Sequence, residues 1–166
     1  MINTNNKIGC LNIEDAHIMF RNFSGKESKY NTKGNRNFCV LIDDVKYVKK
    51  LRKDGWNVRT LAARDDDDED RYYLQVALNF KYMAPKVLMI TRHKKTSLTE
   101  ETIDSLDYAD IAHIDMVLRP YQWSVNGNTG VKAYLKAMYV TIEEDDFAEK
   151  YEGEGYDDVN EDDIPF

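Results

Sequence analysis

Cations and aromatic rings alternate along two neighbouring segments in the last third of the chain. One segment carries them at positions 119, 121 and 123 and the other at 132, 134 and 136: Arg119, Tyr121, Trp123, Lys132, Tyr134 and Lys136. A spacing of two places side chains on one face of a β-strand. Rings can stack on bases and cations can neutralise phosphates, so the pattern favours a groove for single-stranded nucleic acid. The alternative is that the rings are core residues and the cations are only solvated.

A β-hairpin would bring these two rows of side chains together. Residues 114–125 and 131–142 have the apolar alternation of strands, and residues 126–130, Asn-Gly-Asn-Thr-Gly, lie between them. Asn and Gly tolerate positive φ, which tight hairpin turns require. The sequence therefore predicts two antiparallel strands with both rows on one face.

A second hairpin is predicted from residues 56–63 and 71–82, with the acidic run 65–70 as its loop. In the second arm, apolar residues alternate with a polar face on which Tyr73 and Lys81 are candidate DNA contacts. The acidic run could suggest a metal-dependent nuclease, which needs carboxylates. Adjacent carboxylates on one loop cannot converge around an ion, so we expect a solvated tip. Trp56 lacks cationic neighbours on its face and is expected in the core.

A third group of candidates lies near the N-terminus. Residues 17–23 and 37–42 are expected to be strands, and the polar loop 24–35 between them contains a single core candidate, Tyr30. A basic, flexible loop is a common place for a small barrel to grip an oligonucleotide. The alternative, a solvated surface loop, is equally compatible with the sequence. The candidate DNA contacts here are Arg21, Phe23, Lys26, Lys29, Tyr30, Lys33 and Arg36.

The remaining segments complete a mainly β chain. Asp43 or Asp44 is placed to cap a short helix that ends at Gly55. Residues 86–91 are an expected strand, residues 92–95 a basic turn with a weaker case for DNA contact, and residues 99–112 a capped helix or helical turns. Six or seven strands with one or two short helices favour a small barrel. The predicted fold class is mainly β, an OB-fold-like small barrel with a disordered acidic C-terminal tail.

Composition and motifs narrow the function. With 42% hydrophobic residues the chain can form a core, and it has no apolar run long enough to span a membrane and no signal peptide. Cys10 and Cys39 lack metal-ligand spacing and the three histidines are scattered, so we expect no metal and no cofactor. Short catalytic motifs are absent, which indicates a protein that is not an enzyme. The expected location is the cytoplasm.

Charge divides the chain into two parts. Residues 143–166 hold 12 Asp/Glu and one Lys, a net charge of −11, so residues 1–142 carry +4 of the total of −7. A basic body suggests nucleic acid as its partner, and the charged tail is expected to be disordered. An apolar end does not help solubility, so the last five residues are predicted to bind a partner: Asp162, Asp163, Ile164, Pro165 and Phe166.

These residues carry a family resemblance. The acidic run ending in Asp-Asp-Ile-Pro-Phe resembles the C-terminal tip of bacterial single-stranded-DNA-binding proteins. The body, with stretches such as 20–26, 36–40 and 55–59, is similar to bacteriophage-encoded single-stranded-DNA-binding proteins. The resemblance implies an OB-fold that coats single strands and a tip that docks on replication or recombination proteins. For a phage protein, the cytoplasm would be that of the host cell.

The sequence thus predicts a DNA-binding domain over residues 1–142 and a partner-binding tail over 143–166. We expect sequence-independent binding of single-stranded DNA in replication, recombination and repair, and the tail could occupy the groove when DNA is absent. A small phage recombination nuclease is the main alternative, and an acidic protein that mimics DNA is another. A homo-oligomer is left open.

Overall fold

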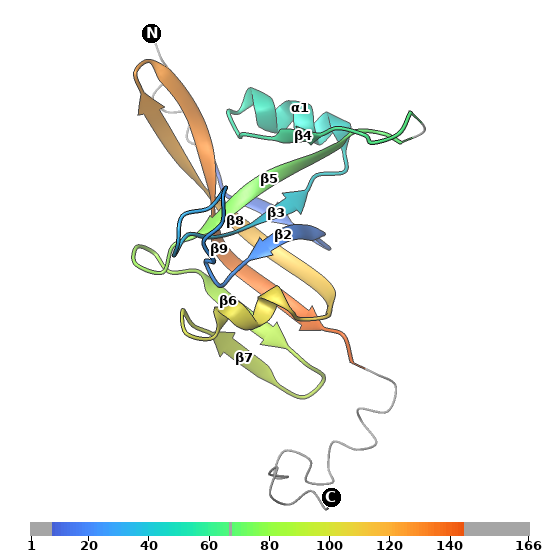
Figure 1. The fold of residues 1–166 in the computed structure, drawn as a ribbon, viewed down its shortest axis with the longest axis vertical. Helices are drawn as coiled ribbons and strands as arrows, with labels where there is room; N and C mark the ends of the chain where they lie inside the picture. The colour runs from blue at the N-terminus through green and yellow to red at the C-terminus, as the bar shows by residue number, and fades with distance from the viewer. Residues whose placement is uncertain (1–7, 67, 145–166) are drawn as a thin grey trace, which may run out of the picture.

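The computed structural model describes residues 8–66 and 68–144, which form a nine-stranded sheet with one α-helix and one 3-10 helix (Figure 1). The predicted tip, and the tail beyond residue 144, lie outside the described residues. The mainly β class is confirmed. In chain order the elements are β1 (Leu11–Ile13), β2 (Ile18–Asn22), β3 (Arg36–Leu41), α1 (Val45–Lys53), β4 (Arg59–Leu61), β5 (Arg71–Leu78), β6 (Lys86–Ile90), β7 (Lys95–Leu98), the 3-10 helix (Ile103–Asp107), β8 (Ile111–Val125) and β9 (Asn128–Ile142).

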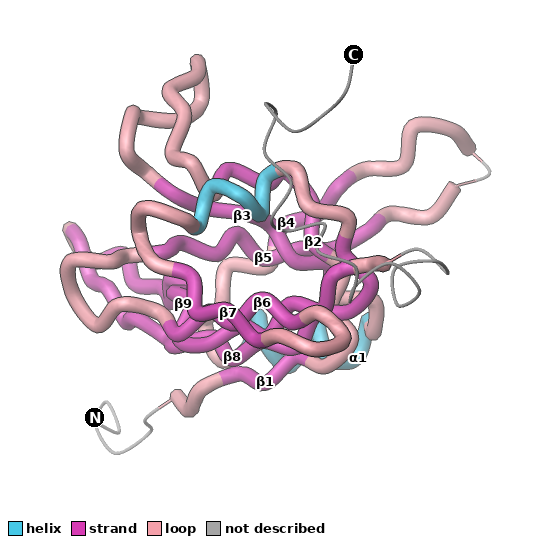
Figure 2. Tube along the Cα trace, turned by 90° about the horizontal axis from the view of Figure 1, so that it is seen from below, coloured by secondary structure: helices cyan, strands magenta, loops and turns pink. Residues whose placement is uncertain are grey.

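The strands form an open, strongly curved sheet (Figure 2). Its main path runs β1-β8-β9-β5-β3-β2, and β4 pairs with β5 beside this path. One edge of β9 pairs along its length with antiparallel β8. The other edge pairs first with parallel β5, at Ala133 and Tyr134, and then with parallel β6, from Ala137 to Thr141. Because β9 is shared in this way, residues from β5 and from the β8–β9 hairpin lie side by side.

One continuous core fills the inside of this sheet. In β5 the alternation predicted from the sequence is confirmed, because Leu74, Val76 and Leu78 are buried. Trp56 is also buried, as predicted. The largest fully buried side chains come from β2–β3, β5, the 3-10 helix and the β8–β9 hairpin: Phe23, Phe38, Leu74, Ile103, Leu106, Met116, Leu118, Leu135 and Met138.

The helix α1 begins where the sequence predicted. The carboxylate of Asp44 accepts a hydrogen bond from the backbone N–H of Lys46 and so caps the first turn. Val48 and Leu51 bury one face against the core, while the basic residues of the last turn lie near the negative end of the helix dipole. In the part of the chain that the structure describes, no helix is long and apolar enough to cross a membrane.

The β8–β9 hairpin is longer and tighter than predicted. Val125 pairs with Asn128, so only Asn126 and Gly127 form the turn, and both have positive φ (50° and 83°). Two consecutive positive φ values define the turn type that follows the right-handed twist of paired strands. The strands extend well beyond the rest of the sheet, and the hairpin projects from the body (Figure 1).

Three elements differ from the sequence prediction. The short strands β1 and β7 were not expected, which raises the number from six or seven to nine in the described residues. Only residues 103–107 of the predicted helical segment 99–112 form a helix, and it is of the 3-10 type. The strand β1 pairs with β8. Near this pairing, His113 of β8 joins the two segments: its ring nitrogens lie 3.1 Å from Asp15 Oδ1 and 3.0 Å from Asp115 Oδ1.

The strand β2 is irregular, and the aromatic rings within it and directly after it differ in burial. Its pairing with β3 shifts register between Met19 and Asn22, and Phe20 has a positive φ of 52°. Such an irregularity interrupts the alternation of faces along a strand. Phe23 lies in the core, whereas Phe20 is 63% exposed.

Candidate nucleic-acid interface

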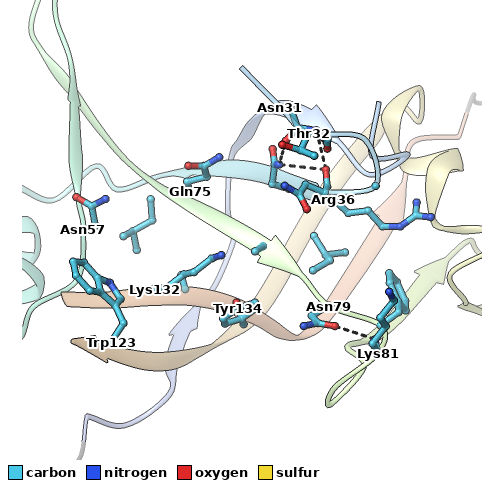
Figure 3. Close-up of a pocket in the computed structure, with 18 of the residues that line it drawn as sticks. Asn31, Thr32, Arg36, Asn57, Gln75, Asn79, Lys81, Trp123, Lys132 and Tyr134 are labelled. Atoms are coloured by element: carbon cyan, nitrogen blue, oxygen red, sulfur yellow. Dashed lines mark hydrogen bonds between the residues drawn. The ribbon is translucent and has the colours of Figure 1, made fainter. Parts of the chain in front are cut away.

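A groove of about 620 Å³ lies over β5, between the β2–β3 loop and the β8–β9 hairpin (Figure 3). Trp123 is at one end of it and Lys81 at the other. Four cations and one carboxylate, Glu100, line it, so its lining is positively charged. Six predicted DNA contacts are among the lining residues: Tyr30, Arg36, Lys81, Trp123, Lys132 and Tyr134.

The pairing register of the hairpin places rings and cations on one face. Arg119 pairs with Tyr134, Tyr121 with Lys132, and Trp123 with Gly130. The Arg119 guanidinium lies 5.3 Å from the centre of the Tyr134 ring, and Lys132 Nζ lies 5.0 Å from the same centre. Both cations are therefore held over an aromatic face. The arrangement joins flat apolar surface to positive charge, which is what stacked bases and their phosphates require.

Three of the six side chains predicted to line the hairpin face lie outside the groove. Two lie beside it, and one lies at a β-bulge of the hairpin. Arg119 and Tyr121 contact Tyr134 but are outside the groove lining, and the Tyr121 ring meets the Tyr134 ring edge-on at 6.0 Å. Lys136 is exposed and has no opposite partner, because the register shifts there in a β-bulge. The hairpin thus extends the positive, aromatic surface beyond the groove itself.

The ring of Trp123 is supported from beneath by a glycine. A Cβ atom at position 130 would come within 2.6 Å of indole Cζ2, so only glycine leaves room for the ring in this position. Gly130 is also the cross-strand partner of Trp123. The indole is 37% exposed. A flat ring packed on the backbone at one side and open at the other is suited to stack on a base.

The β2–β3 loop is held by its own polar side chains. Asn31 Nδ2 donates to the carbonyls of Lys26, Thr32 and Asn35, and Asn31 Oδ1 accepts from Asn37 Nδ2. Side-chain bonds to several carbonyls fix the course of an irregular loop. The prediction that Tyr30 is the core residue of this loop is wrong, because its ring is 90% exposed at the groove.

Several predicted contacts of this region serve the fold. The Arg21 guanidinium donates to the carbonyls of Leu106 and Ala109 at 3.1 and 2.7 Å, which ties β2 to the 3-10 helix. Phe23 is fully buried and stacks on Phe38 with ring centres 5.2 Å apart. A ring without exposed surface cannot stack on a base, so the structure contradicts the prediction that Phe23 contacts DNA.

Arg36 combines a structural contact with a place in the groove. Its guanidinium donates to the Phe23 carbonyl at 2.6 Å and lies 5.9 Å from the centre of the Phe80 ring. Both Arg36 and Phe80 line the groove. Arg36 and Phe80 therefore form a second pair of cation and ring in the groove, besides Lys132 and Tyr134 of the hairpin.

The remaining candidates lie outside the groove lining. Lys26 donates to the Tyr108 hydroxyl at 2.6 Å, and this hydrogen bond raises the pKa of Lys26. Lys29 lies over the Tyr30 ring at 5.7 Å, and Lys33 is exposed on the same loop. Tyr73 is half-buried and meets the ring of Phe20 edge-on at 6.4 Å.

Sequence reasoning missed other residues that line the groove: Asn57, Arg59, Gln75, Asn79 and Phe80. Gln75 and Asn79 stand on the same predicted polar face as Lys81, so the alternation of β5 could have identified them. Phe80 falls on the opposite, apolar face of the same predicted pattern, so the alternation gave no indication of it. For Asn57 and Arg59 the sequence offers no comparable indication, because the fold brings them to the groove from a separate segment.

Comparison with known structures shows the same fold in a phage protein. The single-stranded DNA-binding protein of bacteriophage Enc34, solved in complex with ssDNA, matches with a TM-score of 0.55 and 10% sequence identity over 82% of this chain and 88% of that one. A further structure of the Enc34 protein matches with a TM-score of 0.53 and 12% identity over 93% and 89% of the two chains. At this identity the likeness concerns the fold.

Comparison at the level of sequence gives the family. No curated protein matches the chain. Residues 3–164 match the family model described as “Putative phage ssDNA-binding domain”. The match extends over nearly the whole sequence, including the groove and the hairpin. The chain therefore belongs to the phage ssDNA-binding domain family.

Proposed function

We propose that this protein binds single-stranded DNA without a sequence requirement, along the groove between the β2–β3 loop and the β8–β9 hairpin. The observation that carries the proposal is the groove itself, where the open ring of Trp123 and the Tyr134 ring with Lys132 lie in one positively charged channel. Family membership supports the class of ligand. The Enc34 protein, which has this fold, was solved with ssDNA bound.

The physical basis for a lack of sequence preference is stacking. Every base has a flat face, and stacking on an aromatic side chain contributes about 1–3 kcal/mol per base. Neutralisation of the phosphates by cations adds a contribution to the binding free energy that depends on the salt concentration but not on the DNA sequence. Arg119, Tyr121 and Lys136 would extend the path along the hairpin. Lys26, Lys29 and Lys33 would extend it along the loop.

Titration of poly-dT and of duplex DNA at two salt concentrations tests the proposal. We expect poly-dT to bind more tightly than duplex DNA and its affinity to fall steeply with salt. Replacing Tyr121, Trp123 and Tyr134 by Ala should abolish most of the poly-dT affinity while the fold is retained, since none of the three is a fully buried core residue. A preference for duplex DNA would contradict stacking as the mode of binding.

A wider role is proposed from the tail. Residues 143–166 would recruit replication, recombination or repair proteins through residues 162–166, in the cytoplasm of the phage host, while residues 1–142 hold the DNA. The acidic tail would compete with DNA for the positive groove at low salt. Removal of residues 143–166 should then raise DNA affinity at low salt, and removal of 162–166 alone should abolish partner binding without that rise. Unchanged DNA affinity after removal of the whole tail would contradict the competition.

A nuclease is the alternative class of protein. It would need carboxylates or histidines converging from separate strands around a metal ion. In residues 8–66 and 68–144 there is no group of three or more His, Cys, Asp or Glu side chains placed to hold one. We therefore propose a DNA-binding protein and not an enzyme. Incubation of labelled single-stranded DNA with Mg²⁺ and the protein should leave the DNA intact.

A further inference from the structure

Carboxamide side chains are concentrated in the groove between its aromatic positions. Asn57, Gln75 and Asn79 line the groove: in Figure 3 Asn57 lies at the Trp123 end, Gln75 lies further along and Asn79 lies beside Lys81. Stacking and phosphate contact do not require carboxamides. Each carboxamide has two N–H donors and an acceptor oxygen, which are the groups that can pair with the edge of a base.

Asn31, Asn35 and Asn37 of the loop side also line the groove, and Asn31 and Asn37 are hydrogen-bonded to each other. Of Asn57, Gln75 and Asn79, the first two have their full hydrogen-bonding capacity free. Within residues 8–66 and 68–144, the side chains of Asn57 and Gln75 make no hydrogen bond, and both are exposed. Every nucleobase offers adjacent donor and acceptor atoms on its edge. A free carboxamide can rotate by half a turn to present its donor and acceptor in either order, and so it can match any of the four bases.

Asn79 differs because its orientation is fixed. Its Oδ1 accepts hydrogen bonds from the backbone N–H groups of Lys81 at 2.9 Å and of Tyr82 at 3.2 Å. This identifies the oxygen and leaves the Nδ2 amino group turned toward the channel (Figure 3). Asn79 can therefore offer donors to a base but no acceptor. All four bases carry ring or carbonyl acceptors, so a donor alone does not select one base.

The floor between these side chains is open. Gln75 and Ala77 lie on one face of β5, Asn79 follows directly after the last residue of this strand, and all three line the groove. Two residues of a strand span about 6.6 Å, so the two carboxamides are about 13 Å apart along the strand. Ala77 between them carries only a methyl group. Its small size leaves space for the ring of a base above the sheet.

We propose that bases enter this groove edge-first and are hydrogen-bonded by Gln75 and the amino group of Asn79 on either side of Ala77, and by Asn57 at the Trp123 end. This inference rests on the proposed function and adds a second way of holding bases without sequence preference. Rings at the ends of the groove stack on bases, and rotatable or donor-only carboxamides between them bind base edges. The cations Arg59 and Lys132 remain available for phosphates.

A double-mutant cycle between protein and DNA tests the proposal. The full-length protein and its variants are titrated with an oligo-dT and with an oligonucleotide of equal length in which thymine is replaced by difluorotoluene. This analogue keeps the size and ring of thymine but lacks its hydrogen-bonding groups. The protein variants are Gln75→Met and Asn57→Leu, which remove an exposed carboxamide. The matched control is Gln122→Met, because Gln122 is an exposed carboxamide of β8 outside the groove.

We expect difluorotoluene to weaken binding of the parent protein by about tenfold or more, since several hydrogen bonds are lost at about two- to tenfold each. Gln75→Met and Asn57→Leu should each weaken oligo-dT binding by about two- to tenfold and leave difluorotoluene binding unchanged. Gln122→Met should change neither.

Two results would overturn the inference and are distinguishable from each other. If the parent protein binds both oligonucleotides equally, or if Gln75→Met weakens both equally, the bases are held by stacking alone and single-strand binding itself still stands. If oligo-dT does not bind at all, the proposed function fails and the inference fails with it. Circular dichroism of each variant verifies that the fold is retained.

Discussion

The β8–β9 hairpin and the β2 strand with its loop carry the same kinds of side chain but use them differently. In the outer part of the hairpin, from the Leu118–Leu135 pair to the turn, regular pairing satisfies the backbone, so Trp123, Tyr134 and Lys132 are left to face the groove. In β2, the irregular backbone and the nearby 3-10 helix leave carbonyl groups to be satisfied, and Arg21 donates to two of them. Residue type alone therefore does not place a side chain in the groove. The hydrogen-bonding needs of the neighbouring backbone decide which cations are free, and packing in the core decides which rings are.

The largest expected difference between the two regions is in stability. Phe23→Ala removes a fully buried ring that stacks on Phe38, and should lower the free energy of unfolding by about 3–5 kcal/mol. Trp123→Ala removes a partly exposed ring and should cost much less. Urea denaturation measures both. A small loss of stability for Phe23→Ala, together with a loss of DNA affinity in the folded protein, would show that Phe23 acts at the interface.

The next effect concerns the support of the Trp123 ring. Gly130→Ala places a methyl group within 2.6 Å of the indole and must displace it. We expect a loss of about 1–2 kcal/mol in poly-dT binding, comparable to one stacked base. Gly9→Ala is the matched control, because nothing lies within 4 Å of a Cβ there. Equal poly-dT affinities for the two variants would argue against a positioned ring.

The cations of the two regions should differ in salt dependence. Lys132→Gln removes a cation of the groove and should reduce the slope of log affinity against log salt by about 0.7 for a single strand. Arg21→Gln should leave the slope unchanged and lower stability instead, since its guanidinium bonds carbonyls at 2.7 and 3.1 Å. Poly-dT titrations at four salt concentrations provide the slopes. A reduced slope for Arg21→Gln would place β2 on the DNA path.

The smallest effect is expected at the base of the hairpin. The hydrogen bond with Asp115, aided by Asp15, raises the pKa of His113, and the backbone N–H of Asp15 lowers the pKa of Asp115. Because the pKa of His113 is raised in the folded state, its protonation stabilises the fold. This stabilisation is fully present below pH 6.5 and is lost as the pH rises through the pKa of the folded state. Because the pKa of Asp115 is lowered in the folded state, its ionised carboxylate also stabilises the fold. This stabilisation is present above pH 3.8 and is lost as the pH falls through the pKa of the folded state.

Melting temperature should therefore fall slightly between pH 5.5 and 8.5 in the parent protein and fall less in His113→Gln. The side chains of His113 and Asp115 are 45% exposed and that of Asp15 is 72% exposed, so the change will be modest. The poly-dT affinity of His113→Gln should equal that of the parent at each pH, because the cluster is outside the groove. A pH dependence of stability that is identical in both proteins would assign it to other groups.

The sequence was a good guide where structure is local. Alternation in β5, the Asp44 cap of α1 and the Asn126-Gly127 turn each depend on neighbouring residues, and each is found as predicted or close to it. The face of the hairpin that carries Trp123 follows from the same periodicity.

Other features depend on contacts that a local pattern does not contain. Phe23 is buried because its ring stacks on Phe38 of β3, a contact between separate segments. The strand β1 exists because β8 offers it an edge. Asn57 and Gln75 meet at the groove only because the curved sheet brings separate segments together.

Fluorescence of Trp123 gives the most direct test of base stacking in the groove. The only other tryptophan, Trp56, is buried, so a base can reach Trp123 alone. The account predicts that oligo-dT quenches the emission, that an abasic oligonucleotide of equal length quenches it little and binds more weakly, and that Trp123→Phe loses the signal but keeps part of the affinity. Equal binding of the two oligonucleotides without quenching would contradict it.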